Sequence, residues 1–120
     1  MSGPFDVDSE DLKVQSRREG NATVLSAKGE VTVFSSPALR EVLRRAADEK
    51  PGRLILDLAQ TSYIDSSGVA TLVEALQSVG RHKGQLVLAG MNSRVRGVFE
   101  IARLDAVFAI AADVQEALRP

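Results

Sequence analysis

The chain has 120 residues and carries 15 lysines and arginines against 16 aspartates and glutamates, a formal net charge of −1. This length suits one domain with a real hydrophobic core, and the balanced charge gives no electrostatic reason to expect a nucleic acid or an anionic membrane as partner. The chain has no cysteine and a single histidine, His82. The composition therefore excludes disulfides and thiolate chemistry, and it leaves no partner for a histidine metal site or a histidine-based catalytic triad.

The start of the chain shows no sign of a targeting segment. Residues 1–4 lack the basic and apolar regions of a signal peptide, and no apolar run in the chain approaches the roughly 20 residues of a membrane span. We therefore expect a cytoplasmic protein. Residues 1–10 are polar and acidic, and we expect them to form a flexible N-terminal tail ahead of one domain over residues 11–120.

The first part of the domain has the pattern of a β-hairpin followed by a helix. Residues 12–17 and 23–27 are rich in β-forming side chains and flank a turn signal at 19–21. Ser35-Ser36-Pro37 is typical of a helix start, because serine caps helices well and proline is tolerated in the first turn. Apolar residues then recur at helical spacing until Pro51-Gly52 breaks the pattern.

The rest of the chain alternates strands and helices. Residues 54–58 are mostly apolar, as in a central strand covered on both sides. The further elements expected are a helix at about 66–82, a strand at 85–90, a helix carrying Val95 to Ala102, a strand at 107–110 and a last helix capped by Asp113. Such alternation favours parallel neighbours and right-handed crossovers. We expect an α/β fold with a mixed sheet of about five strands and about four helices, packed mainly on one face.

The segment Tyr63-Ile64-Asp65-Ser66-Ser67-Gly68-Val69 joins the central strand to the second helix. Free N–H groups and a partial positive charge at a helix N-terminus suit an anion, including a phosphate. A helix cap, formed by Asp65 or Ser66, explains the residue type at one of these positions. Ser67 is not explained by a cap, and Gly68 costs about 1 kcal/mol relative to alanine in a helix, although a small residue could let another chain approach closely. The residues alone therefore leave two interpretations open, a cap only and a recognition site.

The sequence lacks the parts of an enzyme. The glycines do not have the spacing of a phosphate-binding loop, and no Gly-x-Ser-x-Gly motif is present. Acidic residues are scattered rather than paired at catalytic spacing, so we expect no enzymatic activity and no cofactor.

Residues 56–69 resemble the signature of STAS domains, and are most similar to the anti-sigma factor antagonists (anti-anti-sigma factors) of bacterial partner switching. Gly29-Glu30-Val31 resembles the Gly-Glu-Leu that precedes the first helix of that family, and residues 93–101 resemble the segment leading into its third helix. The resemblance covers about residues 12–118 and implies a single STAS-like domain.

The resemblance implies a phosphorylatable binding module. In that family the first serine after the aspartate, here Ser66, is phosphorylated by a partner serine kinase that is also the anti-sigma factor. The unphosphorylated protein binds this kinase and frees the sigma factor, and a serine phosphatase of the PP2C type resets the phosphorylated form. We expect a monomer or a weak dimer.

The expected interface combines the 63–68 loop, the exposed side of the second helix and the 32–36 loop. Its expected partner-binding residues are Tyr63, Asp65, Ser66, Ser67, Gly68, Thr71, Glu74, Ser78, Thr32 and Phe34.

Two positions depart from the family pattern. Thr32 stands where the family often has an aspartate, and Arg103 where it usually has a glycine. Phe34 follows Thr32 closely, and both an exposed place in an interface and an anchor in the core remain open for it. Arg94, Arg96 and Arg103 make the third helix basic, which is either a solvated face or a means of steering an acidic partner.

Two further functions remain as alternatives. STAS-like proteins also serve as subunits of ABC-type lipid transport assemblies, where they bind the ATPase subunit, but those commonly carry loops of the Asp-Thr-Ala-Gly kind. The other alternative, direct nucleotide binding, lacks a phosphate-binding loop in this chain.

Overall fold

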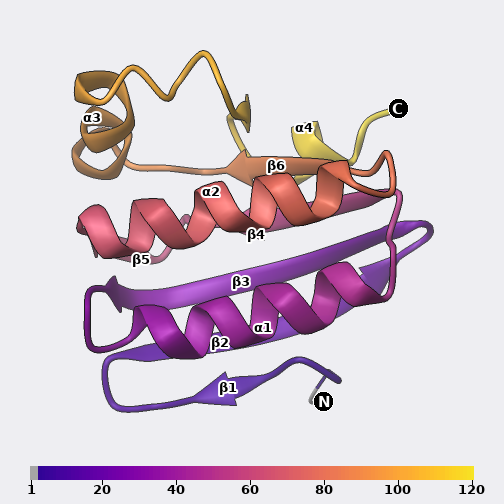
Figure 1. The fold of residues 1–120 in the computed structure, drawn as a ribbon, viewed down its shortest axis with the longest axis horizontal. Coiled ribbons are helices and arrows are strands. Elements are labelled where there is room, and N and C mark those ends of the chain that lie inside the picture. The colour runs from indigo at the N-terminus through magenta and orange to yellow at the C-terminus, as the bar shows by residue number, and fades with distance from the viewer. Residues whose placement is uncertain (1–2) are drawn as a thin grey trace.

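The β-hairpin at the start of the domain leads into a mixed sheet of seven strands, seen in a computed structural model that describes residues 3–120 (Figure 1). The strands are β1 (Val7–Asp8), β2 (Leu12–Glu19), β3 (Ala22–Val31), β4 (Arg53–Asp57), β5 (Thr61–Ile64), β6 (Gln85–Ala89) and β7 (Ala109–Ala111). The helices are α1 (Ser36–Asp48), α2 (Ser66–Gly80), α3 (Ser93–Ile101) and α4 (Val114–Leu118). The expected α/β fold is confirmed, with seven strands instead of about five.

The sheet has the order β1-β2-β3-β4-β6-β7. β2 pairs antiparallel with β1 on one side and with β3 on the other, whereas β3, β4, β6 and β7 run parallel. β5 is one of two strands, with β1, that the sequence pattern missed. It pairs with the second half of β3, where Val31 lies opposite Ile64, while β4 pairs with the first half. A four-residue strand whose partner lies more than 30 residues earlier has little local signal.

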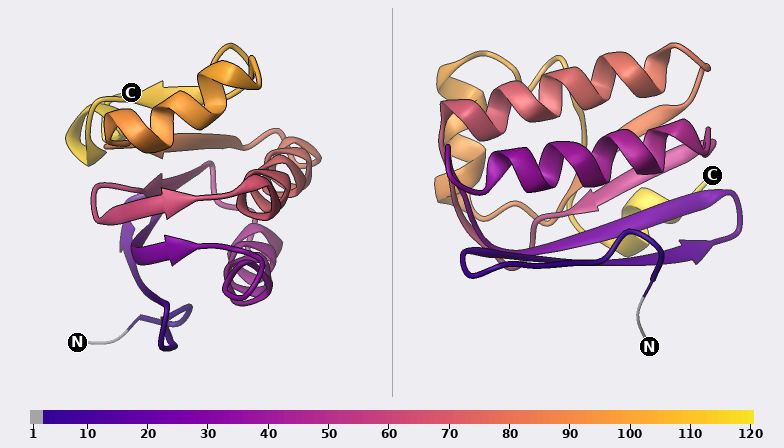
Figure 2. Two further views of the ribbon diagram at one scale, coloured as in Figure 1. Left: turned by 90° about the vertical axis from the view of Figure 1, so that its left-hand side faces the viewer. Right: turned by 60° about the horizontal axis from the view of Figure 1, so that its bottom comes forward.

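Helices cover the two faces of the sheet unequally. α1 and α2 lie side by side on one face, and α4 lies on the other (Figure 2). The larger core lies beneath α1 and α2, where Leu25, Leu54 and Leu88 contribute side chains from three strands. Val24 and Ile55 point to the opposite face and pack in a smaller cluster with α4. α3 closes one end of the larger core with Phe99, whose ring meets that of Phe108 edge to face at 5.5 Å.

The segment before residue 11 is part of the domain from residue 3 onward, where a flexible tail was expected. Phe5 is only 4% exposed and belongs to the larger core, with the Arg45 guanidinium 5.8 Å from its ring centre. Asp6 accepts hydrogen bonds from the backbone N–H groups of Ser16 and Gly3. β1 then pairs with β2. The expectation for residues 1–2 lies outside the described residues.

Three helices begin with a side-chain cap: Asp65 for α2, Asn92 for α3 and Asp113 for α4. α1 is different. Ser35 occupies its N-cap position without capping it, because its hydroxyl accepts from the N–H of Thr32 and donates to the carbonyl of Glu30. Ser35 therefore organises the loop before α1. In the described part of the chain, no helix combines the length and apolar character that a membrane crossing requires.

Candidate functional site

The Asp65-Ser66-Ser67 segment lies at the carboxyl end of β5, where α2 begins. The loop from β3 to α1 and the N-terminus of α3 lie at this same end of the molecule (Figures 1 and 2). Binding sites of open α/β sheets usually form outside the carboxyl ends of the strands. The fold thus brings together the 63–68 and 32–36 loops that the sequence predicted as parts of one interface.

Asp65 holds this site together. One carboxylate oxygen, Oδ1, accepts from the backbone N–H groups of Ser67 (2.9 Å) and Gly68 (3.1 Å) and from the Ser67 hydroxyl. The other, Oδ2, accepts from the backbone N–H of Val33 at 3.1 Å. The Ser67 hydroxyl and then these backbone N–H groups hold the pKa of Asp65 below its usual value, although partial burial opposes them. The carboxylate is therefore ionised at neutral pH and joins the two loops.

Ser66 and Ser67 have different roles although they are neighbours. The Ser67 side chain is half-buried and donates to Asp65. Ser66 is the first residue of α2, its side chain is exposed, and within residues 3–120 its hydroxyl makes no hydrogen bond. Since Asp65 supplies the cap, the Ser66 hydroxyl is available for chemistry at the positive end of the helix dipole.

Gly68 serves the fold instead of leaving space for another chain. It is buried, and a Cβ atom built there would lie 2.6 Å from Cγ1 of Ile64 and 2.7 Å from Cγ1 of Val31. The lack of a side chain therefore lets α2 pack closely on β3 and β5. The suggestion that a small residue here admits a partner's backbone is wrong.

The 32–36 loop presents an apolar tip beside this site. Phe34 is 84% exposed and Val33 is 59% exposed, so Phe34 is not a core anchor. The loop is tied to itself, because the Phe34 N–H donates to the Thr32 hydroxyl and the Thr32 N–H donates to Ser35. An exposed phenylalanine on an ordered loop is suited to a protein interface.

Tyr63 connects the site to α3. Its partly exposed ring lies 5.5 Å from the Arg94 guanidinium, a cation–π contact. Asn92, the cap of α3, also donates through its side-chain amide to the carbonyl of Thr61 in β5. Arg94 therefore faces the site, which the sequence pattern of a basic helix did not reveal.

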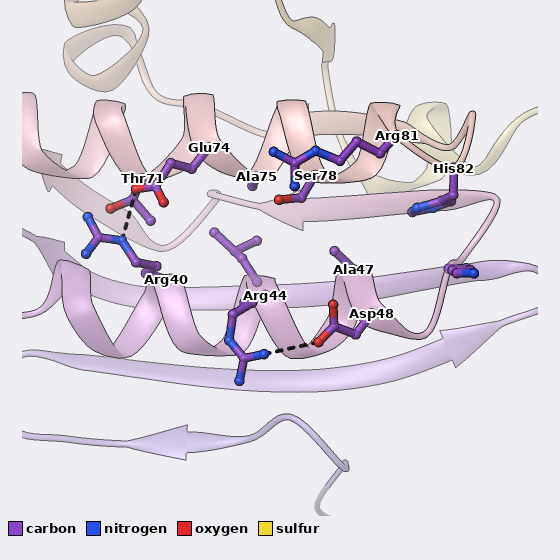
Figure 3. Close-up of a pocket in the computed structure, with 12 residues that line it drawn as sticks. Arg40, Arg44, Ala47, Asp48, Thr71, Glu74, Ala75, Ser78, Arg81 and His82 are labelled. Carbon is purple, nitrogen blue, oxygen red and sulfur yellow. Dashed lines mark hydrogen bonds and ion pairs between the residues drawn. The ribbon is translucent and has the colours of Figure 1, made fainter.

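The side of α2 that was expected to be exposed faces α1. Thr71 is 1% exposed and donates to the carbonyl of Ser67, so its expected place on the surface is wrong. Glu74 pairs with Arg40 of α1 at 3.0 Å. Together with Ser78 they line a groove of about 700 Å³ between the two helices (Figure 3). A second arginine of this groove is also paired with a carboxylate, Arg44 with Asp48 at 3.1 Å.

The described residues contain no group of three or more histidine, cysteine, aspartate or glutamate side chains placed to hold a metal ion. What the site offers chemically is a free hydroxyl at a helix N-terminus, a fixed carboxylate beside it and an apolar tip. Such a site fits recognition of a protein whose binding depends on charge.

Comparison with known proteins agrees with this geometry. A model of the STAS domain matches residues 13–117. This chain belongs to the STAS domain family. An anti-sigma-B factor antagonist of Bacillus subtilis is 31% identical over 101 residues, which are 84% of this STAS chain and 92% of the relative. The resemblance to anti-sigma factor antagonists found in the sequence is confirmed.

Solved structures share the STAS fold. An anti-sigma factor antagonist from Mycobacterium paratuberculosis superposes with a TM-score of 0.84 at 20% identity, covering 98% of this chain and 96% of that one. SpoIIAA of Bacillus, solved in its phosphorylated form, superposes with a TM-score of 0.66 at 19% identity, covering 85% of this chain and 94% of that one. At these identities the likeness is one of fold.

Proposed function

We propose that this STAS domain is an anti-sigma factor antagonist and works by partner switching, without enzymatic activity of its own. The unphosphorylated form binds an anti-sigma factor that is also a serine kinase, and the sigma factor is released. Phosphorylation of Ser66 abolishes this binding, and a PP2C-type serine phosphatase restores it. The names of the curated relatives support the first part of this proposal.

The observation that carries the switch is the state of Ser66. Its hydroxyl is exposed and unengaged at the first position of α2, while the neighbouring Asp65 supplies the cap and binds Ser67. A kinase can thus reach the hydroxyl without breaking a hydrogen bond of the fold. The helix N-terminus tolerates the added charge.

The physical effect of the phosphate is local. It adds about 1.5 to 2 negative charges at neutral pH, directly beside the ionised carboxylate of Asp65. A partner surface that accommodates Asp65, Tyr63 and Phe34 then meets a strongly anionic patch in place of a neutral hydroxyl. Repulsion and the cost of desolvating the phosphate oppose binding.

The test is the intact mass of the protein purified from its own cells, followed by fragment mapping of any phosphate. Phosphate on Ser66 in part of the population supports the switch, whereas phosphate confined to Ser67 would contradict the assignment. A chain that stays unmodified during growth and stress, bound throughout to an ATPase, would indicate the transport-assembly subunit instead.

A further inference from the structure

Two exposed features of the site, Ser66 and the apolar tip formed by Val33 and Phe34, lie on separate segments of the chain. The tip belongs to the β3–α1 loop, and Ser66 begins α2. The side chain between them is Asp65, whose two carboxylate oxygens face different segments. Oδ1 accepts from the first turn of α2, and Oδ2 accepts from the N–H of Val33 at 3.1 Å.

We propose that Asp65 is a clamp that couples the phosphorylation state of Ser66 to the position of the Val33–Phe34 tip. This inference rests on the proposed function for the claim that Ser66 is phosphorylated. It adds that the unphosphorylated form presents a tip fixed to Asp65, and that phosphorylation loosens this one attachment while the bonds within the loop remain.

The physical reason is competition for the same donors. The first turn of a helix offers a few free N–H groups, and Asp65 uses those of Ser67 and Gly68. A phosphate on Ser66, the residue next to Asp65, is a stronger acceptor for N–H groups of this turn and repels the carboxylate. Once Oδ1 loses these two N–H bonds, the Ser67 hydroxyl is the remaining donor to that oxygen. The Asp65 backbone stays bonded to Val31, but its carboxylate is less firmly held, and the bond from Oδ2 to Val33 weakens.

The consequence for the partner follows from linkage. If phosphorylation loosens the tip, a partner that binds the fixed tip must favour the unphosphorylated form by the same coupling free energy. Phe34, at 84% exposure, is then a contact whose availability is regulated from Ser66. Repulsion at Ser66 and release of the tip act in the same direction.

The chain offers a variant that separates capping from clamping. In Asp65→Asn the side-chain oxygen still caps α2, since asparagine is as good a cap as aspartate. The amide NH₂ that replaces the second oxygen is a donor and cannot accept from Val33. Ser93 supplies the matched control for phosphorylation, because it is the first residue of α3 as Ser66 is of α2, and Asn92 caps that helix.

The experiment compares backbone amide signals of the full chain by ¹H–¹⁵N NMR, with phosphoserine inserted at position 66 or 93 during translation. We expect hydrogen exchange of the Val33 amide to accelerate about tenfold in the chain phosphorylated at Ser66 and in Asp65→Asn, and to stay unchanged in the chain phosphorylated at Ser93. An unchanged Val33 amide on phosphorylation of Ser66 overturns the clamp, whatever Asp65→Asn does. This measurement uses no binding partner. A negative result would therefore overturn the clamp without deciding whether phosphorylation of Ser66 controls binding.

Discussion

At the scale of single residues, Gly68 tests how closely α2 must approach the sheet. For Gly68→Ala we expect a loss of up to about 2 kcal/mol in the free energy of unfolding. Overpacking against Ile64 and Val31 costs roughly 1–3 kcal/mol, and the better helix propensity of alanine returns only about 1 kcal/mol. Urea denaturation of the two proteins measures the difference.

The control for this prediction is Gly97→Ala within α3. A Cβ atom there meets nothing within 4 Å, so we expect the variant to gain about 0.5–1 kcal/mol. If Gly68→Ala were stabilised to the same extent as Gly97→Ala, helix propensity alone would govern both positions and the packing argument would fail.

The backbone conformation of Arg103 leads to a second prediction about stability. It follows α3 with φ of +59°, in the left-handed region that favours glycine, which explains why the family usually has glycine there. We expect Arg103→Gly to raise the free energy of unfolding by about 1 kcal/mol, seen as a higher melting temperature. Arg103→Ala removes the charge but keeps the strain, so an equal rise in that variant would contradict this explanation.

The residue scale also shows what the sequence could and could not predict at the site. Asp65 was one of two residues predicted to cap α2, because the residue type and its position just before the helix define a cap. The burial of Thr71 could not be predicted, since the helical period of α2 does not say which of two neighbours it packs against. α2 contacts both the sheet and α1, so its buried stripe includes Thr71 and Ala75, while Val73 and Leu76 of the expected inner face are half-buried.

At the scale of elements, the segment before β2 depends on one carboxylate. Backbone N–H groups of Ser16 and Gly3 hold the pKa of Asp6 below its usual value. Because the folded-state pKa lies below the unfolded one, the ionised group stabilises the fold above about pH 4, and this contribution disappears as the pH falls through the folded-state pKa. We expect Asp6→Asn to be less stable than the native chain at pH 7 and to lose less stability on acidification below pH 4. Thermal unfolding measured at a series of pH values tests this, and parallel curves for the two proteins would contradict it.

Elements were predictable where their own residues carry a clear local pattern. The hairpin of β2 and β3, the strands β4 and β6 and all four helices carry local patterns and were expected. β1 and β5 were not. β1 has only two residues, although it pairs with the nearby β2, and β5 is a four-residue strand that pairs with a segment more than 30 residues earlier. The apolar character of Phe5 gives a signal only once the core beneath α1 is known.

At the scale of the whole molecule, the question is whether the switch acts through total charge, through refolding or through local charge. The chain carries a net charge of −1, so Ser66→Asp and Gln115→Asp both bring it to −2. Gln115 lies in α4 on the opposite face of the sheet from α1 and α2. An acidic residue in the first turn of a helix is favourable by about 0.3–1 kcal/mol, so we expect both variants to keep the fold and the melting temperature.

Binding should separate these two variants. With the kinase identified by its phosphorylation of Ser66, we expect Ser66→Asp to weaken binding at least tenfold, because the charge lies beside Asp65 in the interface. Ser66→Ala and Gln115→Asp should bind as the native chain does, since neither adds charge there. Titration calorimetry gives the affinities, and circular dichroism checks the fold. Equal weakening by Gln115→Asp would indicate an effect of net charge, and a lowered melting temperature in Ser66→Asp would indicate refolding. Only loss of binding confined to Ser66→Asp, in a folded protein, is consistent with a local electrostatic switch.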